Sequence, residues 1–266
     1  MKKKMFFNTS VTFSAEYQAI LDYATTNSIT HPSLSVKTAQ NQLVLDLKSY
    51  SLWSKLDSLN IFACGDSALT GFMKIDWILL NSGTVVGGLT YSNDGISGNG
   101  TTQYFTTAFV HNFSHTNYKQ NSASKGVVIS NYDGIGANGG IMGFAASNVD
   151  RWEFNSALQR INQNFTNLSS AINFQPSVGG SGSAILVRTS SSDVNGYVTG
   201  TKFTRTATSS TVETNGNITL GKANSAGTAS RFASSFFGGS LTDTDVSNLR
   251  TAFNTYFVAI GLSAYA

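Results

Sequence analysis

The sequence predicts a mainly β protein: an antiparallel β-sandwich with an N-terminal helical segment and a C-terminal helix. From residue 59 onward, short runs of β-branched and aromatic residues recur at roughly ten-residue spacing, as in sandwiches and jelly rolls. Turn-forming pairs such as Asn-Gly and Asp-Gly separate these runs. Near both ends of the chain, apolar residues recur instead at helical spacing, which predicts the helices.

The first helix is predicted to begin after Ser14, a favoured N-cap residue. Apolar residues then follow at helical spacing, namely Tyr17, Ile20, Leu21 and Ala24. We expect this helix to end near residues 27–28, because the His-Pro pair at 31–32 forces an extended break. A second helix is predicted from about residue 35 to residue 50, and a short turn at 52–56 closes the helical hairpin.

The β region is predicted from its strand-like runs and the turns between them. The expected strands are Leu59–Ala63, Ile75–Leu80, Gln103–Phe109, Lys125–Ile129, Ile141–Phe144, Ala184–Arg188, Gly196–Thr208, Thr211–Val212 and Asn217–Leu220. The expected turns are Asn93-Asp94-Gly95, Gly98-Asn99-Gly100, Asp133-Gly134, Asn195-Gly196 and Asn215-Gly216.

The chain is predicted to end in a helix capped by residues 241–245. Its apolar face is formed by Val246, Leu249, Phe253, Tyr256 and Phe257. We therefore divide the chain into residues 1–58, a helical segment for anchoring or oligomerisation, and residues 59–266, a β-sandwich that ends in a helix.

The composition excludes several classes of function. The 266 residues carry a net charge of +3, and the only basic cluster is the three lysines at residues 2–4, whereas nucleic-acid binding needs a dense basic stripe. The single cysteine, Cys64, excludes an internal disulfide framework and a thiolate metal cluster. No apolar run approaches the ~20 residues of a membrane span or the ~7–15 of a secretory signal. We therefore expect synthesis in a cytoplasm, without membrane insertion.

Residues 61–67, Ile-Phe-Ala-Cys-Gly-Asp-Ser, resemble the nucleophile block of the GDS-type esterases. That chemistry needs a histidine to activate Ser67, and those esterases place it in an Asp-x-x-His near the C-terminus. None of His31, His111 and His115 has an aspartate three residues before it. We interpret the segment as a strand that leaves the sheet through a turn, and a hydrolase using Ser67 is the third hypothesis for function.

Two further patterns resemble ligand sites. Residues Gly134–Gly139 match G-x-G-x-x-G, but strand-like residues follow where a dinucleotide site needs a helix, which favours a sandwich loop. His111 and His115 are four residues apart, the helical spacing of two zinc ligands, but neither a helical pattern nor a third ligand accompanies them. We interpret both histidines as surface residues.

Glycoside hydrolysis requires two carboxylates roughly 5–10 Å apart. The three glutamates, Glu16, Glu153 and Glu213, are spread over almost two hundred residues, and no aspartate pair stands in a recognisable frame. We therefore predict no catalytic, cofactor or metal site and no enzymatic activity.

Aromatic side chains could instead stack on sugar rings. The candidates are Trp53, Trp77, Trp152, Tyr91, Tyr104, Tyr118 and Tyr132. Because most aromatic residues of a β-sandwich belong to its core, we expect most of these to be structural, and the glycan-binding residues stay unknown.

Three segments resemble a known group of proteins. The segment Thr84–Phe105, which includes Gly98–Phe105, is similar to the G-x-G-T-x-x-Y strand entry of laminin-G-like, concanavalin A-like jelly rolls. Phe236–Asp245 resembles the last strand and closing helix of that fold. The opening, with Tyr17–Ala24, Gln40–Leu47 and Trp53–Asp57, is similar to virion proteins of tailed bacteriophages that join a helical segment to such a jelly roll.

The resemblance implies a non-enzymatic virion structural protein, either a capsid decoration or head-fibre subunit or a tail-associated one. Its partners would be other virion proteins and further copies of the chain, and it would be located in the virion after assembly in the host cytoplasm. The alternative hypothesis is a glycan-binding adhesin that contacts the host cell surface.

Overall fold

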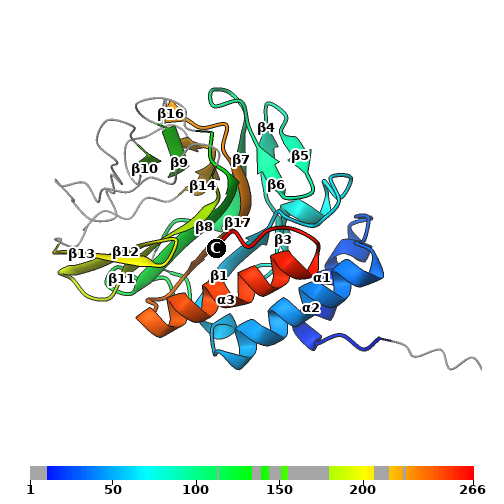
Figure 1. Cartoon of the computed structure of the whole chain (residues 1–266), viewed down its shortest axis with the longest axis horizontal. Coiled ribbons are helices and arrows are strands. Elements are labelled where there is room, and N and C mark those ends of the chain that lie inside the picture. Colours follow the sequence, from blue (N-terminus) through cyan, green and yellow to red (C-terminus); the bar gives the residue numbers. More distant parts are fainter. Residues whose placement is uncertain are drawn as a thin grey trace, which may run out of the picture.

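The predicted fold class, mainly β with helices near both ends of the chain, is confirmed. The computed structural model describes residues 11–112, 114–133, 139–143, 151–154, 180–206, 216–223 and 226–266. Within these residues, antiparallel strands form two main sheets, and helices cover one side of the larger sheet (Figure 1).

Each described α-helix begins at a capping side chain. The described helices are α1 (Ala15–Thr26), α2 (Leu34–Ser49) and α3 (Asp243–Ala259), with short 3₁₀ turns η1 (Trp53–Lys55) and η2 (Phe72–Lys74). Ser14 and Ser33 accept backbone N–H groups at the start of α1 and α2. Thr242 and Asp245 form a reciprocal capping box at α3. Caps satisfy amide groups that a helix leaves unpaired, so the starts of α1 and α3 could be predicted from their capping residues.

The larger sheet has the main strand order β13-β12-β11-β8-β17-β1-β2-β3, and β6 pairs with both β17 and β5. Its strands are β1 (Leu56–Ile61), β2 (Ile75–Asp76), β3 (Asn81–Ser82), β5 (Thr90–Ser92), β6 (Gly95–Ser97), β8 (Ala123–Asn131), β11 (Gly182–Arg188), β12 (Asp193–Val198), β13 (Thr201–Thr206) and β17 (Arg231–Gly238).

The smaller sheet has the strand order β10-β9-β14-β7-β4. Its strands are β4 (Thr84–Val86), β7 (Tyr104–Val110), β9 (Gly139–Gly143), β10 (Arg151–Phe154) and β14 (Asn217–Leu220). Two short strands, β15 (Lys222–Ala223) and β16 (Ala226–Gly227), pair with each other.

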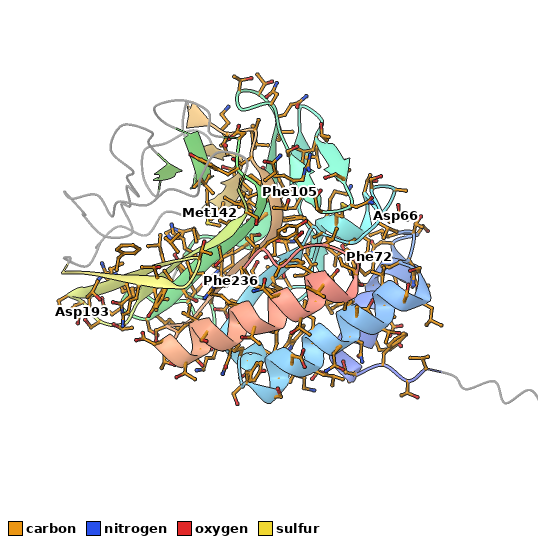
Figure 2. All side chains as sticks on the ribbon, in the orientation of Figure 1. Asp66, Phe72, Phe105, Met142, Asp193 and Phe236 are labelled. Carbon is orange, nitrogen blue, oxygen red and sulfur yellow. The ribbon has the colours of Figure 1, made fainter. Side chains whose placement is uncertain are left out.

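The large sheet is buried on both faces, as two neighbouring phenylalanines of β17 show. The ring of Phe236 lies 6.5 Å from Phe253 of α3, whereas the ring of Phe237 stacks on Phe109 of β7 at 4.4 Å. Successive strand residues point to opposite faces, so the sheet lies between a helical layer and the smaller sheet. Figure 2 shows Phe236 beside α3 and Phe105 among the strands farther from the helices.

The helical layer joins both ends of the chain through a buried polar cluster. Tyr17 of α1 donates a hydrogen bond to Gln40 of α2 (2.6 Å), and Gln40 donates to Tyr256 of α3 (3.3 Å) and to the Cys64 sulfur (3.7 Å). Tyr256 in turn donates to the carbonyl oxygen of Ala63 (2.7 Å). The helices are thus bonded to one another and to the chain just after β1.

The domain boundary that we placed between residues 58 and 59 falls inside β1, which begins at Leu56. Buried side chains of α1 and α2, such as Ile20 and Leu43, belong to the same hydrophobic cluster as those of the strands.

The predicted strand Ile75–Leu80 is wrong beyond Asp76, because a turn follows β2. The buried Asp76 carboxylate accepts the amides of Leu59 (3.2 Å), Ile78 (3.0 Å) and Leu79 (3.0 Å), and Ser58 donates its hydroxyl to the other oxygen. An aspartate that bonds amides two and three residues ahead reverses the chain, so this side chain overrides the apolar run that follows it.

The predicted strand Gly196–Thr208 is also wrong as a single element. It is a hairpin, with β12 and β13 joined by Thr199 and Gly200, whose φ values of 42° and 89° are typical of a type I′ turn. The expected turn at Asn195-Gly196 lies inside β12, where Asn195 pairs with Thr204. The predicted strand Thr211–Val212 lies outside the described residues.

Four other predicted strands are present in the structure. Gln103–Phe109, Lys125–Ile129, Ala184–Arg188 and Asn217–Leu220 are strands, with bounds shifted by a few residues. Asn93 and Asp94 form the expected turn between β5 and β6, which we did not predict as strands. No helix in the described part of the chain is long and apolar enough to cross a membrane.

Candidate functional site

Ser67 lies on an exposed turn without a histidine partner. Its amide donates to the side chain of Asn93 (3.0 Å), and Asp66 accepts the amide of Ala68 (2.9 Å), so the predicted exit from strand to turn is confirmed. Within the described residues, no histidine is hydrogen-bonded to the Ser67 hydroxyl. The geometry therefore provides no group to activate this serine.

The histidines serve packing and local hydrogen bonds. His111 is buried and hydrogen-bonded to the Tyr118 hydroxyl (2.9 Å), which corrects our interpretation of it as a surface residue. The His115 ring stacks on Phe109, with centroids 4.2 Å apart. His31 is hydrogen-bonded to Thr25 (3.0 Å). Across the described ranges, no cluster of three or more His, Cys, Asp or Glu residues could hold a metal ion.

The predicted aromatic platforms are mostly core residues. Trp77, Tyr118 and Tyr132 are buried. Trp53 and Tyr91 are half-buried against the same core, and Tyr104 is half-buried beneath the Lys222 ammonium, 5.0 Å from the ring centroid. The side chains of Trp152 and Glu153, all of Glu213, and residues 134–138 of the glycine-rich motif lie outside the described residues. These aromatic residues therefore provide no fully exposed ring for stacking among those described.

A solvent-reached pocket lies where hairpin β12–β13 meets the first half of α3. It has a volume of about 180 Å³ and is lined by Tyr197, Gly200, Lys202, Asp243, Val246, Ser247 and Arg250. The four residues from α3 are spaced at i, i+3, i+4 and i+7, so they form one face of the helix. This volume exceeds the ~10–15 Å³ that a single water needs and is smaller than the ~300–1,000 Å³ of drug-sized pockets.

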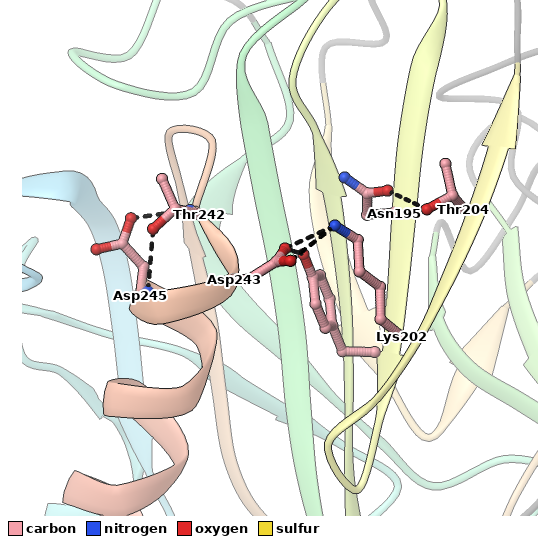
Figure 3. A network of polar contacts seen from close by, with 7 residues as sticks. Asn195, Lys202, Thr204, Thr242, Asp243 and Asp245 are labelled. Atoms are coloured by element: carbon pink, nitrogen blue, oxygen red, sulfur yellow. Dashed lines mark hydrogen bonds and ion pairs between the residues drawn. The ribbon is translucent and has the colours of Figure 1, made fainter.

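Asp243 is the centre of the polar network in this pocket (Figure 3). Tyr197 donates its hydroxyl to Asp243 (2.6 Å), and the Lys202 ammonium lies 2.7 and 2.9 Å from the two carboxylate oxygens. Tyr197 and Lys202 are cross-strand partners, so both side chains leave the hairpin on the side of α3. The next pair on this face, Asn195 and Thr204, extends the polar surface with a 2.9 Å hydrogen bond.

The start of α3 is fixed independently of this pocket. Asp245 accepts the Thr242 amide (2.8 Å) and forms an ion pair with Lys55 of η1 (2.6 Å). Burial raises the pKa of Asp245, but Lys55 and the capping bonds outweigh burial and hold that pKa below its usual value. The capping box therefore places Asp243 beside the hairpin without using it as a cap.

The protonation states in the pocket suit binding rather than proton transfer. Burial, followed by the hydrogen bond to Asp243, raises the pKa of Tyr197 well above its usual value. The hydrogen bonds from Lys202 and Tyr197 lower the pKa of Asp243. At neutral pH, Tyr197 is therefore protonated and Asp243 ionised, whereas general acid–base catalysis needs a pKa near the working pH. The network can orient a bound molecule but is not tuned to exchange protons with it.

Comparison with models of known protein families finds no match, and comparison with curated proteins finds none. Solved structures do resemble the chain. The sialidase of Trypanosoma rangeli is 8% identical with a TM-score of 0.53, over 80% of this chain and 38% of the sialidase. The receptor binding domain of botulinum neurotoxin C/D mosaic serotype is 8% identical with a TM-score of 0.50, over 73% of this chain and 50% of that structure.

A third structure is domain 4 of AbnA, an extracellular arabinanase of Geobacillus stearothermophilus, with 13% identity, a TM-score of 0.48, and coverage of 73% of this chain and 98% of that domain. At such identities a structural likeness shows the fold alone. The chain has the fold of a jelly-roll β-sandwich, as the resemblance of its sequence implied. It spans well under half of the sialidase and half of the toxin structure.

The pocket residues were missed because the sequence places them in two distant segments. Tyr197 and Lys202 face each other across a turn that we predicted at Asn195-Gly196 instead of Thr199-Gly200. On α3, the helix was predicted from its apolar positions, whereas Asp243 and Arg250 lie on a neighbouring face. A signal was present: these two charged residues are seven apart in a predicted helix, which places them on one side.

Proposed function

We propose that the chain is a non-enzymatic glycan-binding domain that holds one sugar ring in the pocket between hairpin β12–β13 and α3. The observation that carries the proposal is the mixture of fixed hydrogen-bonding groups around a small open cavity. Sugar hydroxyls both donate and accept, and the pocket offers the Asp243 carboxylate as an acceptor and the Lys202 ammonium as a donor. Its volume of about 180 Å³ suits a single sugar ring and is too small to enclose several linked sugars.

Two further observations support binding. The exposed Ser247 hydroxyl and the Arg250 guanidinium also line the pocket from α3, so a ligand would meet polar groups from both α3 and the hairpin. The fold is shared with a receptor binding domain and with a sialidase that has been described in complex with sialic acid. Recognition of a surface glycan fits the adhesin hypothesis drawn from the sequence.

The test fills the pocket. Ser247→Trp places a large side chain in the cavity from an exposed helix position, while Thr255→Trp places the same side chain two turns away on exposed α3 surface. On a glycan array, we expect wild type and T255W to bind the same glycans, and S247W to lose at least about tenfold in affinity. Blank arrays with wild-type protein at high micromolar concentration, or unchanged binding by S247W, would contradict the proposal.

A virion structural role is the second proposed function, and exposed apolar side chains on the helical layer favour it. Leu34 and Leu45 of α2 and Val258 of α3 are 57%, 40% and 59% exposed. The start of α2 and the end of α3 lie together, because both Val36 and Ile260 are close to Gly65. Apolar groups on a helical surface suit docking on another protein, so this layer would anchor the chain to a capsid or tail while the pocket stays free.

Particle composition tests this role. We expect gradient-purified particles of the encoding phage to contain wild-type protein, and a Leu34→Glu, Val258→Glu double variant to be depleted at least about tenfold by quantitative mass spectrometry, because a charge cannot be buried unpaired in an interface. A Thr251→Glu variant, changed at an exposed polar position of α3, should be incorporated normally. Absence of the wild-type chain from particles would exclude the virion role, and normal incorporation of the double variant would exclude docking through this layer.

A further inference from the structure

After α3 the chain reverses and runs back along the helix that it has just left. The reversal is a Schellman motif, in which Gly261, with a φ of 81°, donates its amide to Val258 (3.0 Å). Leu262 then donates its amide to Phe257 (2.9 Å). Residues 262–266, which we call the strap, follow this turn and lie between α3 and the large sheet (Figure 1).

The end of the strap is held by two side chains of α3. Asn254 accepts the Ala266 amide at Oδ1 (2.7 Å) and donates Nδ2 to the Ala266 oxygen (2.9 Å). Arg250, one turn earlier on the same face of the helix, donates Nη2 to that oxygen (3.1 Å). Ala266 is only 5% exposed, whereas Ser263 and Ala264 in the middle of the strap are exposed. The strap therefore ends in a closed seat on α3.

Arg250 connects this seat with the pocket between hairpin β12–β13 and α3. Its guanidinium lies against the hairpin turn, because a Cβ atom on Gly200 would be 2.1 Å from Nη1, and both residues line the pocket. Within the described residues, the bond to Ala266 is the one hydrogen bond of this guanidinium. Since an arginine side chain has many rotamers, the position of this part of the pocket wall depends on whether Ala266 is seated.

We propose that the strap regulates the pocket, and that Asn254 is the positioning residue through which it acts. With Ala266 seated, Arg250 stays against Gly200 and completes the wall. With Ala266 released, the guanidinium leaves the turn and the wall opens beside it. This inference rests on the proposed function and adds the regulation of the same site. Because coupling between two binding events is reciprocal, a sugar that needs the complete wall also stabilises the seated strap.

Hydrogen exchange without any ligand tests the link between strap and wall. We expect Asn254→Leu, which removes both bonds to Ala266 at similar volume, to speed amide exchange at least about fivefold in residues 262–266 and in the hairpin turn, residues 198–202. Asn248→Leu is the matched control, because Asn248 is half-buried on α3 and makes no hydrogen bond among the described residues, and neither segment should change. Faster exchange in the strap alone would overturn the inference.

The glycan array of the proposed function then measures the effect on binding. We expect N254L to bind the same glycans as wild type with about five- to tenfold lower affinity, and N248L to bind as wild type does. In an Arg250→Gln background, N254L should cause no further loss, because no guanidinium is left to position.

Ala266→Pro, which deletes the amide donor from the strap itself, should act as N254L does in both measurements and replaces it if N254L does not fold. Additive losses of N254L and R250Q, or wild-type affinity of N254L and A266P, would overturn this inference and leave glycan binding standing. Blank arrays with wild-type protein would overturn glycan binding and its regulation together.

Discussion

Replacing Asp76 with alanine is expected to cost about 3–5 kcal/mol of unfolding free energy. The carboxylate is fully buried and accepts four donors: the amides of Leu59, Ile78 and Leu79 and the hydroxyl of Ser58. Alanine would leave these donors buried without partners, at the point where the chain turns back after β2. Urea denaturation at pH 7, followed by circular dichroism, measures the loss.

Two variants separate this role from a general effect of removing an aspartate. Asp66→Ala removes an exposed carboxylate that accepts the single amide of Ala68, and we expect a change within about 0.5 kcal/mol. Asp76→Asn keeps the oxygen that accepts three amides, and its new amide group can donate to Ser58, so we expect a loss of about 1 kcal/mol or less. Equal losses for D76A and D66A would show that the buried bonds contribute little.

The stability of wild type relative to D76N is expected to depend on pH, with a defined sign. Burial raises the pKa of Asp76 from 3.8 to about 6, against the lowering effect of its four donors. The folded state then holds this proton more tightly than the unfolded state, so stability from Asp76 is greatest below about pH 4 and falls as pH rises toward 6. Relative to D76N, wild type should lose about 2–3 kcal/mol between pH 4 and pH 7. A constant difference over that range would contradict the raised pKa.

The helices could be predicted because their signals are local. Ser14 caps α1 through the amide three residues ahead, and Thr242 does the same for α3 through Asp245. Strand β7 was likewise visible, because its buried and half-buried residues alternate between the core and the outside. By contrast, β8 and β17 are buried on both faces and include buried polar residues such as Ser234 and Ser235, so their sequences show no clear alternation.

The pocket could not be predicted because long-range pairing selects its turn. Asn195-Gly196 and Thr199-Gly200 are both acceptable turns by local chemistry, but pairing with β11 places Gly196 opposite Leu186 and extends β12 to Val198. That register brings Tyr197 opposite Lys202 and directs both toward α3. The sequence contains each residue of the site, while the contacts between them depend on the order β13-β12-β11 and on where α3 crosses the sheet.

The helical layer that positions α3 is itself held by a polar centre. Gln40 is fully buried, accepts the Tyr17 hydroxyl, and donates to Tyr256 and Cys64. Tyr256 also has an acceptor in Ala63, and the Cys64 thiol has one in Ile61, so Tyr17 is the partner that depends most on Gln40. Burial raises the pKa of Tyr17 far above its usual value, which keeps this hydroxyl protonated and in need of an acceptor.

Gln40→Met, which removes the amide at similar volume, is therefore expected to lower the free energy of unfolding by about 2–3 kcal/mol. Gln42→Met is the matched control, since Gln42 is exposed on the same helix and bonds only Asp46 among the described residues, and we expect a change within about 0.5 kcal/mol.

The double variant Gln40→Met, Tyr17→Phe decides whether the hydrogen bond itself is responsible. Removing both partners leaves no unsatisfied hydroxyl at this point, so the double variant should be more stable than Q40M alone by about 1 kcal/mol, a coupling that chemical denaturation of the four proteins in the cycle measures. Strictly additive losses would instead assign the effect to packing around Gln40. In that case the three helices would be held on the sheet by apolar contacts such as Phe236 against Phe253, and the polar centre would set their alignment without stabilising it.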